Sequence, residues 1–211
     1  MASGHQGTFV PKEGRRAEAI EMLMGSVAFA EEHGAIVSIR SSVIGGPETG
    51  RLTIAQVFEN PDARASFLDA ADAVEKHSIR DTMASADPPA GNGGRILFDE
   101  VGEGDMPLKP AIMFAVVFGI GPGKRQEANE VLAATSARHS TLGVQSRNWQ
   151  IALAGSSGAQ LARTSAFDTW ADYTRFVAGN QAIAEPQPLG QGIASGALQL
   201  LSTSASRSLN R

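Results

Sequence analysis

Apolar residues recur with two alternating periods along the first half of the chain. Between residues 13 and 33 they fall three and four positions apart, which predicts a helix with one buried face. Gly34 follows, where a left-handed residue commonly ends a helix. The β-branched segment 35–44 predicts a strand, and Gly45, Gly46, Pro47 and Gly50 predict a turn into a second strand at 51–58. The hydrophobic pattern therefore indicates a helix followed by a β-hairpin.

A second helix is predicted to follow the hairpin. Asn60 can cap its first turn, and Pro61 suits the first helical position, where a backbone N–H is not needed. The segment 87–94, rich in glycine and proline, predicts a loop. The first half thus has the order βαββαβ. Its predicted elements are strand 5–10, helix 13–33, strands 35–44 and 51–58, helix 61–83 and strand 95–101.

The second half is a diverged copy of the first. A shift of 109 positions aligns 14–67 with 123–176 without a gap, and 12 of the 54 pairs are identical. About four identities are expected at ordinary residue frequencies. The excess indicates a duplicated unit. The identical pairs include Gly14/Gly123, Leu23/Leu132, Gly34/Gly143, Leu52/Leu161, Phe58/Phe167 and Phe67/Phe176.

The duplication predicts two units, residues 1–104 and residues 105–211. The second unit repeats the order of the first, with its hairpin turn around 155–158. A loop is predicted at 186–192, and the serine-rich end from Thr203 onward is expected to fray. The remaining predicted elements are strand 111–119, helix 123–141, strands 144–153 and 160–167, helix 169–182 and strand 197–202.

The repeated order of elements predicts the fold. A βαββαβ unit forms a four-stranded antiparallel sheet with both helices on one face. Two units in one chain can cover each other's open sheet faces and so close a barrel. We therefore expect an α+β fold in which two ferredoxin-like βαββαβ repeats form an intrachain eight-stranded α+β barrel.

Two strand-to-helix corners carry a resemblance to a known superfamily. The sequences VFENPDA at 57–63 and AFDTWADY at 166–173, with the repeated element order, resemble the dimeric α+β barrel superfamily of ferredoxin-like folds. This superfamily includes the antibiotic-biosynthesis-monooxygenase-like, NIPSNAP-like and EthD-like families. The resemblance implies a small-molecule monooxygenase or isomerase without a bound organic cofactor, acting on a hydrophobic or aromatic metabolite inside the barrel.

A non-catalytic barrel is the alternative. It would bind a small ligand or serve as an assembly module, because no acid, base or nucleophile stands out in either half. The sequence therefore leaves open whether the protein is an enzyme, and it names no catalytic residue. An enzyme should show polar groups that converge on one point of a closed pocket. A scaffold should show a filled barrel and exposed apolar patches.

The composition of the chain limits the classes of partner that the protein is expected to bind. The net charge is −4 without a basic tract, which argues against nucleic acid. The chain has no cysteine, and no apolar run approaches the roughly 20 residues of a membrane span. We therefore expect a cytoplasmic monomer or homodimer whose partner is a small hydrophobic or aromatic ligand, either neutral or anionic.

Charged residues in the middle of strands are the best candidate site residues. Such residues are costly to bury unless they reach water or a partner. Arg40, Arg147 and Arg163 occupy such positions, beside Asn148 and Trp149. Projecting into the barrel, they would line a pocket for an anionic or aromatic ligand, with an arginine or Asn148 stabilising an enolate-like oxyanion. The alternative is that the arginines lie at strand edges and extend to solvent.

Histidine offers a further candidate. The four histidines lack the spacing of zinc ligands, so we expect no metal site. The resemblance implies one more role, because some haem-degrading members of the superfamily place an axial histidine near the end of the second helix. His77 lies in such a region. The alternative is an exposed histidine near a helix end, so haem is the lesser of the functional alternatives.

Overall fold

The computed structural model describes residues 1–44, 49–102, 104–152 and 160–210. Of the first predicted turn, residues 45–47 lie outside this range, and Gly50 is described with a left-handed φ of +85°. The turn predicted at 155–158 lies wholly outside it. The first half contains β1 (Ser3–Pro11), α1 (Arg16–Met24), α2 (Val27–Glu32), β2 (Ile36–Ile44), β3 (Leu52–Phe58), α3 (Pro61–Ala73), α4 (Ser78–Met83) and β4 (Ala90–Glu100). The second half contains β5 (Ile112–Ile120), α5 (Arg125–Thr141), β6 (Ser146–Ala152), β7 (Gln160–Phe167), α6 (Trp170–Ala182), α7 (Pro188–Ala194) and β8 (Leu198–Ser208).

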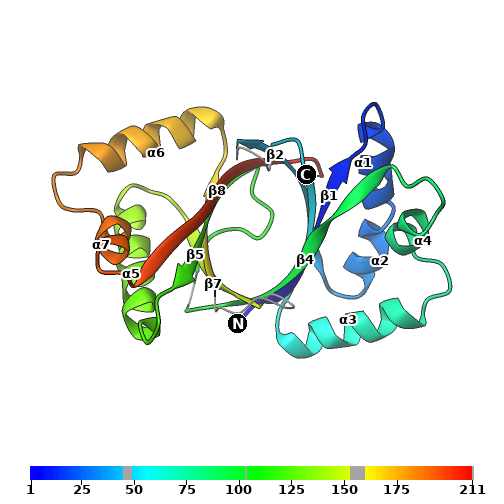
Figure 1. The fold of residues 1–211 in the computed structure, drawn as a ribbon, viewed down its shortest axis with the longest axis horizontal. Coiled ribbons are helices and arrows are strands. Elements are labelled where there is room, and N and C mark those ends of the chain that lie inside the picture. The colour runs from blue at the N-terminus through cyan, green and yellow to red at the C-terminus, as the bar shows by residue number, and fades with distance from the viewer. Residues whose placement is uncertain (45–48, 103, 153–159, 211) are drawn as a thin grey trace.

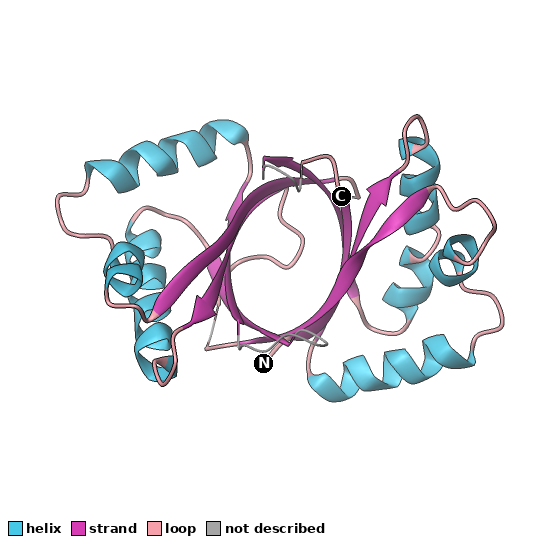
Figure 2. Ribbon diagram, in the orientation of Figure 1, coloured by secondary structure: helices cyan, strands magenta, loops and turns pink. Residues whose placement is uncertain are grey.

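The strands form one closed barrel, with the helices outside it on two opposite sides (Figure 1, Figure 2). The order around the ring is β1-β3-β2-β8-β5-β7-β6-β4, and every neighbouring pair is antiparallel. Two seams, β2–β8 and β4–β6, join the halves. The predicted eight-stranded barrel of two ferredoxin-like repeats is confirmed.

Positions 109 residues apart adopt the same local structure. Gly34 and Gly143 follow α2 and α5 with φ of +81° and +70°, the left-handed turn that glycine adopts without strain. Leu52 and Leu161, at 0% exposure, are buried under the helices of their own halves. The repeat seen in the sequence is therefore a repeat of structure.

Both long predicted helices are split in the first half. Residues 13–33 form α1 and α2, and residues 61–83 form α3 and α4. Gly25 lies at the first break, where an added Cβ would come within 2.7 Å of Ser78 Oγ. The Ser78 hydroxyl, at the start of α4, donates to the Met22 carbonyl over 2.9 Å. The two breaks therefore pack against each other. This is a tertiary contact, which the spacing of apolar residues along the chain does not reveal.

A predicted helix cap is confirmed, whereas two predicted loops are wrong. The Asn60 side chain accepts a hydrogen bond from Ala63 N at 2.9 Å, which confirms the predicted cap of α3. Two predicted loops are wrong, because β4 begins at Ala90 and α7 occupies most of 186–192. Glycine and proline misled the prediction: Gly93 lets β4 approach the Thr8 carbonyl closely, and α7 begins with a proline.

The predicted fraying of the C-terminal end is also wrong. β8 continues to Ser208 and pairs with both β5 and β2, so it closes the ring between the halves. Asn210, 8% exposed, then bonds along β2: its Oδ1 accepts from Ile39 N at 2.7 Å and its Nδ2 donates to the Val37 carbonyl at 3.1 Å. The last strand is thus part of the barrel.

The linker between β4 and β5 lies against the inside of the barrel. In Figure 1 it crosses the opening of the ring. Arg147 Nε donates to the Met106 carbonyl at 2.6 Å, and Arg40 Nη1 donates to the Pro110 carbonyl at 2.7 Å. Met106 is 2% exposed. The linker therefore forms part of the barrel interior, and the unit boundary between residues 104 and 105 stays a prediction. Among the described helices, none is long and apolar enough to cross a membrane.

Candidate functional site

The barrel encloses a cavity of about 240 Å³. Side chains alternate across a strand, so every second residue of each strand faces inward. Ser38, Arg40 and Ser42 of β2 line the cavity for this reason. Pockets for drug-sized ligands occupy roughly 300 Å³ or more. A ligand of this cavity must therefore be small.

The cavity has a polar wall and an apolar wall, one from each half of the ring. The contiguous strands β1, β3, β2 and β8 present most of the polar side chains, and β5, β7, β6 and β4 with the linker present most of the apolar ones. The polar wall contains Gln6, Thr8, Ser38, Arg40, Ser42, Arg51, Thr53, Ser202, Ser204 and Ser206. The apolar wall contains Ile96, Phe98, Met106, Leu108, Met113, Ala115, Val117, Trp149, Ile151 and Ala162.

Divergence of the two repeats produced this asymmetry. Arg40 and Trp149 are 109 positions apart and face the cavity from the two opposite seams. Ser206 and Phe98 are also equivalent, because β8 and β4 pair with equivalent positions of β5 and β1. Equivalent positions thus carry polar residues at the β2–β8 seam and aromatic residues at the β4–β6 seam.

Arg40 is held rigidly at the polar seam. It is 2% exposed. Nε donates to Ser206 Oγ at 2.9 Å and Nη2 to the Ser206 carbonyl at 2.8 Å. Nη1 reaches Ser38 Oγ and the Pro110 carbonyl, and Nη2 also reaches the Ala111 carbonyl. Burial lowers the pKa of Arg40 to about 10, so it stays protonated at neutral pH. These partners are all neutral oxygens.

The lining as a whole is positively charged. Arg40 and Arg51 both face the cavity, and no carboxylate lies among the described lining residues. Arg147 does not line it: its guanidinium forms an ion pair with Glu100 and holds the linker. Within the described lining, the cavity therefore places the cation of Arg40 near a bound anion, and no carboxylate there would repel it.

Trp149 provides a flat apolar surface opposite Arg40. Its Nε1 donates to Thr164 Oγ1 at 2.9 Å, which fixes the plane of the indole. Phe98 meets it edge to face, with ring centroids 5.0 Å apart. Aromatic rings in this arrangement favour planar apolar partners. Of the predicted residues, Arg40 and Trp149 are the two that line this cavity.

Arg163 and Asn148 lie on the other face of the sheet, beneath α5. Arg163 Nη1 donates to Ser136 Oγ at 2.6 Å and to Asn148 Oδ1 at 3.0 Å. Its Nη2 lies 3.0 Å from His139 Nδ1 and donates to Ser146 Oγ at 2.7 Å. Its Nε is buried without a partner. We call these five residues the α5 cluster. The prediction that Arg163 projects into the barrel is wrong, and so is its extension to solvent, because it is 2% exposed.

The α5 cluster replaces an apolar core. In the first half, the residues equivalent to the five members of the cluster belong to the hydrophobic core or pack against it. Sequence reasoning missed three members of the cluster, and this repeat comparison could have found them. The equivalent pairs are Val27/Ser136, Ala30/His139, Val37/Ser146, Ile39/Asn148 and Ile54/Arg163.

His139 is neutral in this environment. Burial first, and then the charges of Arg163 and Arg138, lower its pKa to about 3. Its Nδ1 accepts from Arg163, so the ring proton is on Nε2. The ring stands edge-on to Phe176 at 4.7 Å, and Phe176 also lines an outer cleft of about 370 Å³ between α6 and β7. The cluster is thus separated from a surface cleft by one side chain.

We expect acid to destabilise the protein through its buried histidines. Burial lowers the pKa of His5 to about 4 and that of His139 to about 3. The unfolded chain binds these protons near pH 6.5, so stability is complete above that pH and falls as pH decreases toward 4 and 3. At pH 5 each histidine should account for a loss of about 2 kcal/mol. Urea unfolding at pH 7.5 and pH 5 should therefore show a smaller loss in His139→Asn; equal losses would contradict the assignment.

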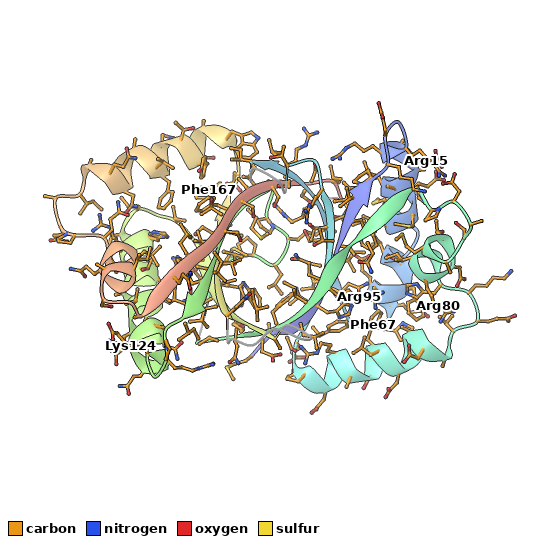
Figure 3. The ribbon with its side chains drawn as sticks, viewed as in Figure 1. Arg15, Phe67, Arg80, Arg95, Lys124 and Phe167 are labelled. Atoms are coloured by element: carbon orange, nitrogen blue, oxygen red, sulfur yellow. The ribbon has the colours of Figure 1, made fainter. Side chains whose placement is uncertain are left out.

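His77 lies outside the barrel. It precedes α4, and its Nδ1 accepts from Arg80 N at 3.3 Å. Figure 3 shows Arg80 among the helices of the first half, away from the barrel. The described cavity lining contains no histidine or tyrosine, the chain has no cysteine, and no described group of acids and histidines could hold a metal. His77 therefore does not line the barrel cavity, and its role as a haem ligand at the end of the second helix stays a prediction.

Comparisons with known proteins identify the fold. No protein-family model and no curated protein matches the sequence. An anthrone oxidase-like protein matches with a TM-score of 0.66 and 12% identity, over 99% of this chain and 92% of the other. A candidate monooxygenase from Lactobacillus acidophilus matches with 0.58 and 11%, over 99% and 93%. A haem-binding protein from Thermus thermophilus matches with 0.54 and 7%, over 99% and 91%. The chain therefore has the fold of the dimeric α+β barrel proteins, as a tandem repeat.

Proposed function

We propose that the barrel binds a small, planar, apolar molecule that carries a negative charge. The observation that supports this is the two-walled cavity, with Arg40 on one seam and Trp149 on the opposite seam. The charge of the ligand would face Arg40, whose buried cation lacks a carboxylate partner among the described residues. The body of the ligand would lie against Trp149 and Phe98. Side chains that bind the ligand come from rigid strands, so the site is largely preformed.

Naphthoate and the neutral naphthamide test this proposal as a matched pair. Calorimetry should show naphthoate binding at least about tenfold more tightly, because only it pairs its charge with the cationic wall. Ala115→Leu, which fills the cavity, should weaken naphthoate binding by a further factor of about ten. Ala133→Leu, the same change on the exposed face of α5, serves as control. Equal affinities for the two probes, or full affinity in Ala115→Leu, would rule the proposal out.

A second candidate function is catalysis without a bound organic cofactor at the α5 cluster. It is favoured by the convergence of Arg163, Asn148 and His139 next to the outer cleft. A guanidinium and an amide are suited to stabilising an enolate-like oxyanion. The solved structures of this fold that are described as oxidase-like and monooxygenase proteins support an oxygenase over an isomerase. His139 is the nearest candidate base, although its lowered pKa makes it a weak one.

A further inference from the structure

Most of the hydroxyls on the polar wall of the barrel make no hydrogen bond to another described residue. Ser206 and Ser38 accept hydrogen bonds from Arg40. Within the described residues, the side chains of the other uncharged members have no hydrogen-bonding partner. These are Gln6, Thr8, Ser42, Thr53, Ser202 and Ser204, and the Oγ of Ser42 is buried as well as unpaired.

These hydroxyls are regularly placed. Ser202, Ser204 and Ser206 alternate along β8 and all face the cavity, so successive hydroxyls lie roughly 7 Å apart. Ser42 is the β2 residue opposite Ser206 in the ladder. In the first half, the position equivalent to Ser204 is Ile96, since both pair with equivalent residues of β5 and β1. The row of serines is therefore a feature of one seam only.

We propose that the ligand of the barrel carries several hydroxyl or carbonyl oxygens along one edge of a planar apolar frame; this rests on the proposed function. A serine hydroxyl can both donate and accept, so it pairs with either kind of oxygen. Ser42 Oγ is buried without a partner, which is costly, and a ligand oxygen that pairs with it recovers that cost on binding. The other side chains are exposed or half-buried, and they can add hydrogen bonds to the same edge of the ligand. The oxygenated edge faces β8 and β2, and the bare edge faces Trp149 and Phe98. The chemical class is a hydroxylated aromatic acid or enol.

The alternative is that water occupies the polar wall whatever the ligand. Ordered water satisfies polar groups nearly as well as protein does. Added oxygens on the ligand would then replace water without a gain in affinity. The two cases differ in how affinity changes along a series of ligands that differ only in hydroxylation.

Calorimetry with naphthoate and its mono- and dihydroxylated derivatives distinguishes them. The full chain should bind the dihydroxylated acid about five- to fiftyfold more tightly than naphthoate, as one or two new hydrogen bonds provide. Ser202→Ala combined with Ser204→Ala should remove this gain, so that the three acids bind the double variant with similar affinities. Ser140→Ala, on the exposed face of α5, is the control and should keep the gain.

Each failure has its own pattern. Naphthoate binding without any gain from hydroxylation overturns the oxygenated ligand and leaves the proposed function standing. A gain that survives in the double serine variant also overturns it, because the oxygens then bind elsewhere. Absence of binding by all three acids removes the proposed function together with this inference. Thermal melting of each variant shows that it is folded before it is titrated.

Discussion

A chain that ends at Ser202 should not fold. The deletion removes every ladder pair between β8 and β2 and more than half of those with β5, so one seam of the barrel is lost. It also removes Asn210, which satisfies Ile39 N and the Val37 carbonyl. Opening the ring exposes the unpaired edges of two strands and the interior between them. The loss should exceed the roughly 5–15 kcal/mol by which a domain of this kind is stable.

Circular dichroism and size-exclusion chromatography would measure this outcome. The truncated chain should lack a cooperative melt and should elute as aggregate. Arg207→Gln is the matched control, because it changes an exposed side chain of the same strand and keeps every backbone pair. Asn210→Ala should fall between the two, with a loss of about 1–3 kcal/mol from two buried backbone groups left without partners. A truncated chain that melts like the full one would show that β8 does not close the barrel.

The same segment explains which part of the fold was hidden from sequence reasoning. Helices and hairpins were predictable because their apolar residues face a core at a fixed period. β8 instead presents serines to a polar cavity. Its sequence from residue 201, LSTSASRS, therefore lacks the alternation of apolar and polar residues that predicts a strand, and it is typical of a frayed chain end. The glycine-rich start of β4 was hidden for a related reason, since close approach of two backbones favours glycine there. Tertiary context decides both cases.

The candidate site was predictable in part for a similar reason. Arg40 and Trp149 were found because a charged or bulky polar residue in mid-strand needs an explanation, and the alternation of strands gave them one face. The repeat could have shown on which face of the sheet Arg163 lies, because its equivalent in the first half, Ile54, belongs to the core under the helices. The linker could not be placed from sequence. Its position depends on hydrogen bonds from Arg40 and Arg147 to its carbonyls.

Loss of Arg163 and exchange of the whole α5 cluster should have opposite effects on stability. Arg163→Ala leaves a cavity and deprives four acceptors of their donor, so we expect a loss of about 3–5 kcal/mol. The fivefold variant S136V/H139A/S146V/N148I/R163I installs the residues of the first half, which already pack in an equivalent frame. It removes a buried cation with neutral partners. Replacing a buried ion pair by packed apolar side chains is often neutral or stabilising by about 1–4 kcal/mol, and we expect the same outcome for this cluster.

Urea unfolding of both variants measures the contrast. Stability of the fivefold variant at or above that of the native protein would mean that the cluster is kept for a reason other than stability. A loss as large as that of Arg163→Ala would instead make the cluster a structural feature of this half.

Oxygen uptake with anthrone as probe separates the two candidate functions. If the cluster is catalytic, the native protein should consume oxygen above the uncatalysed rate, and the fivefold variant should lose this activity while remaining folded. Ala115→Leu should keep the activity, because it fills the barrel cavity on the opposite face of the sheet. Uptake that is lost in Ala115→Leu and kept in the fivefold variant would move the chemistry into the barrel. Arg40 would then be the cation that stabilises the developing oxyanion.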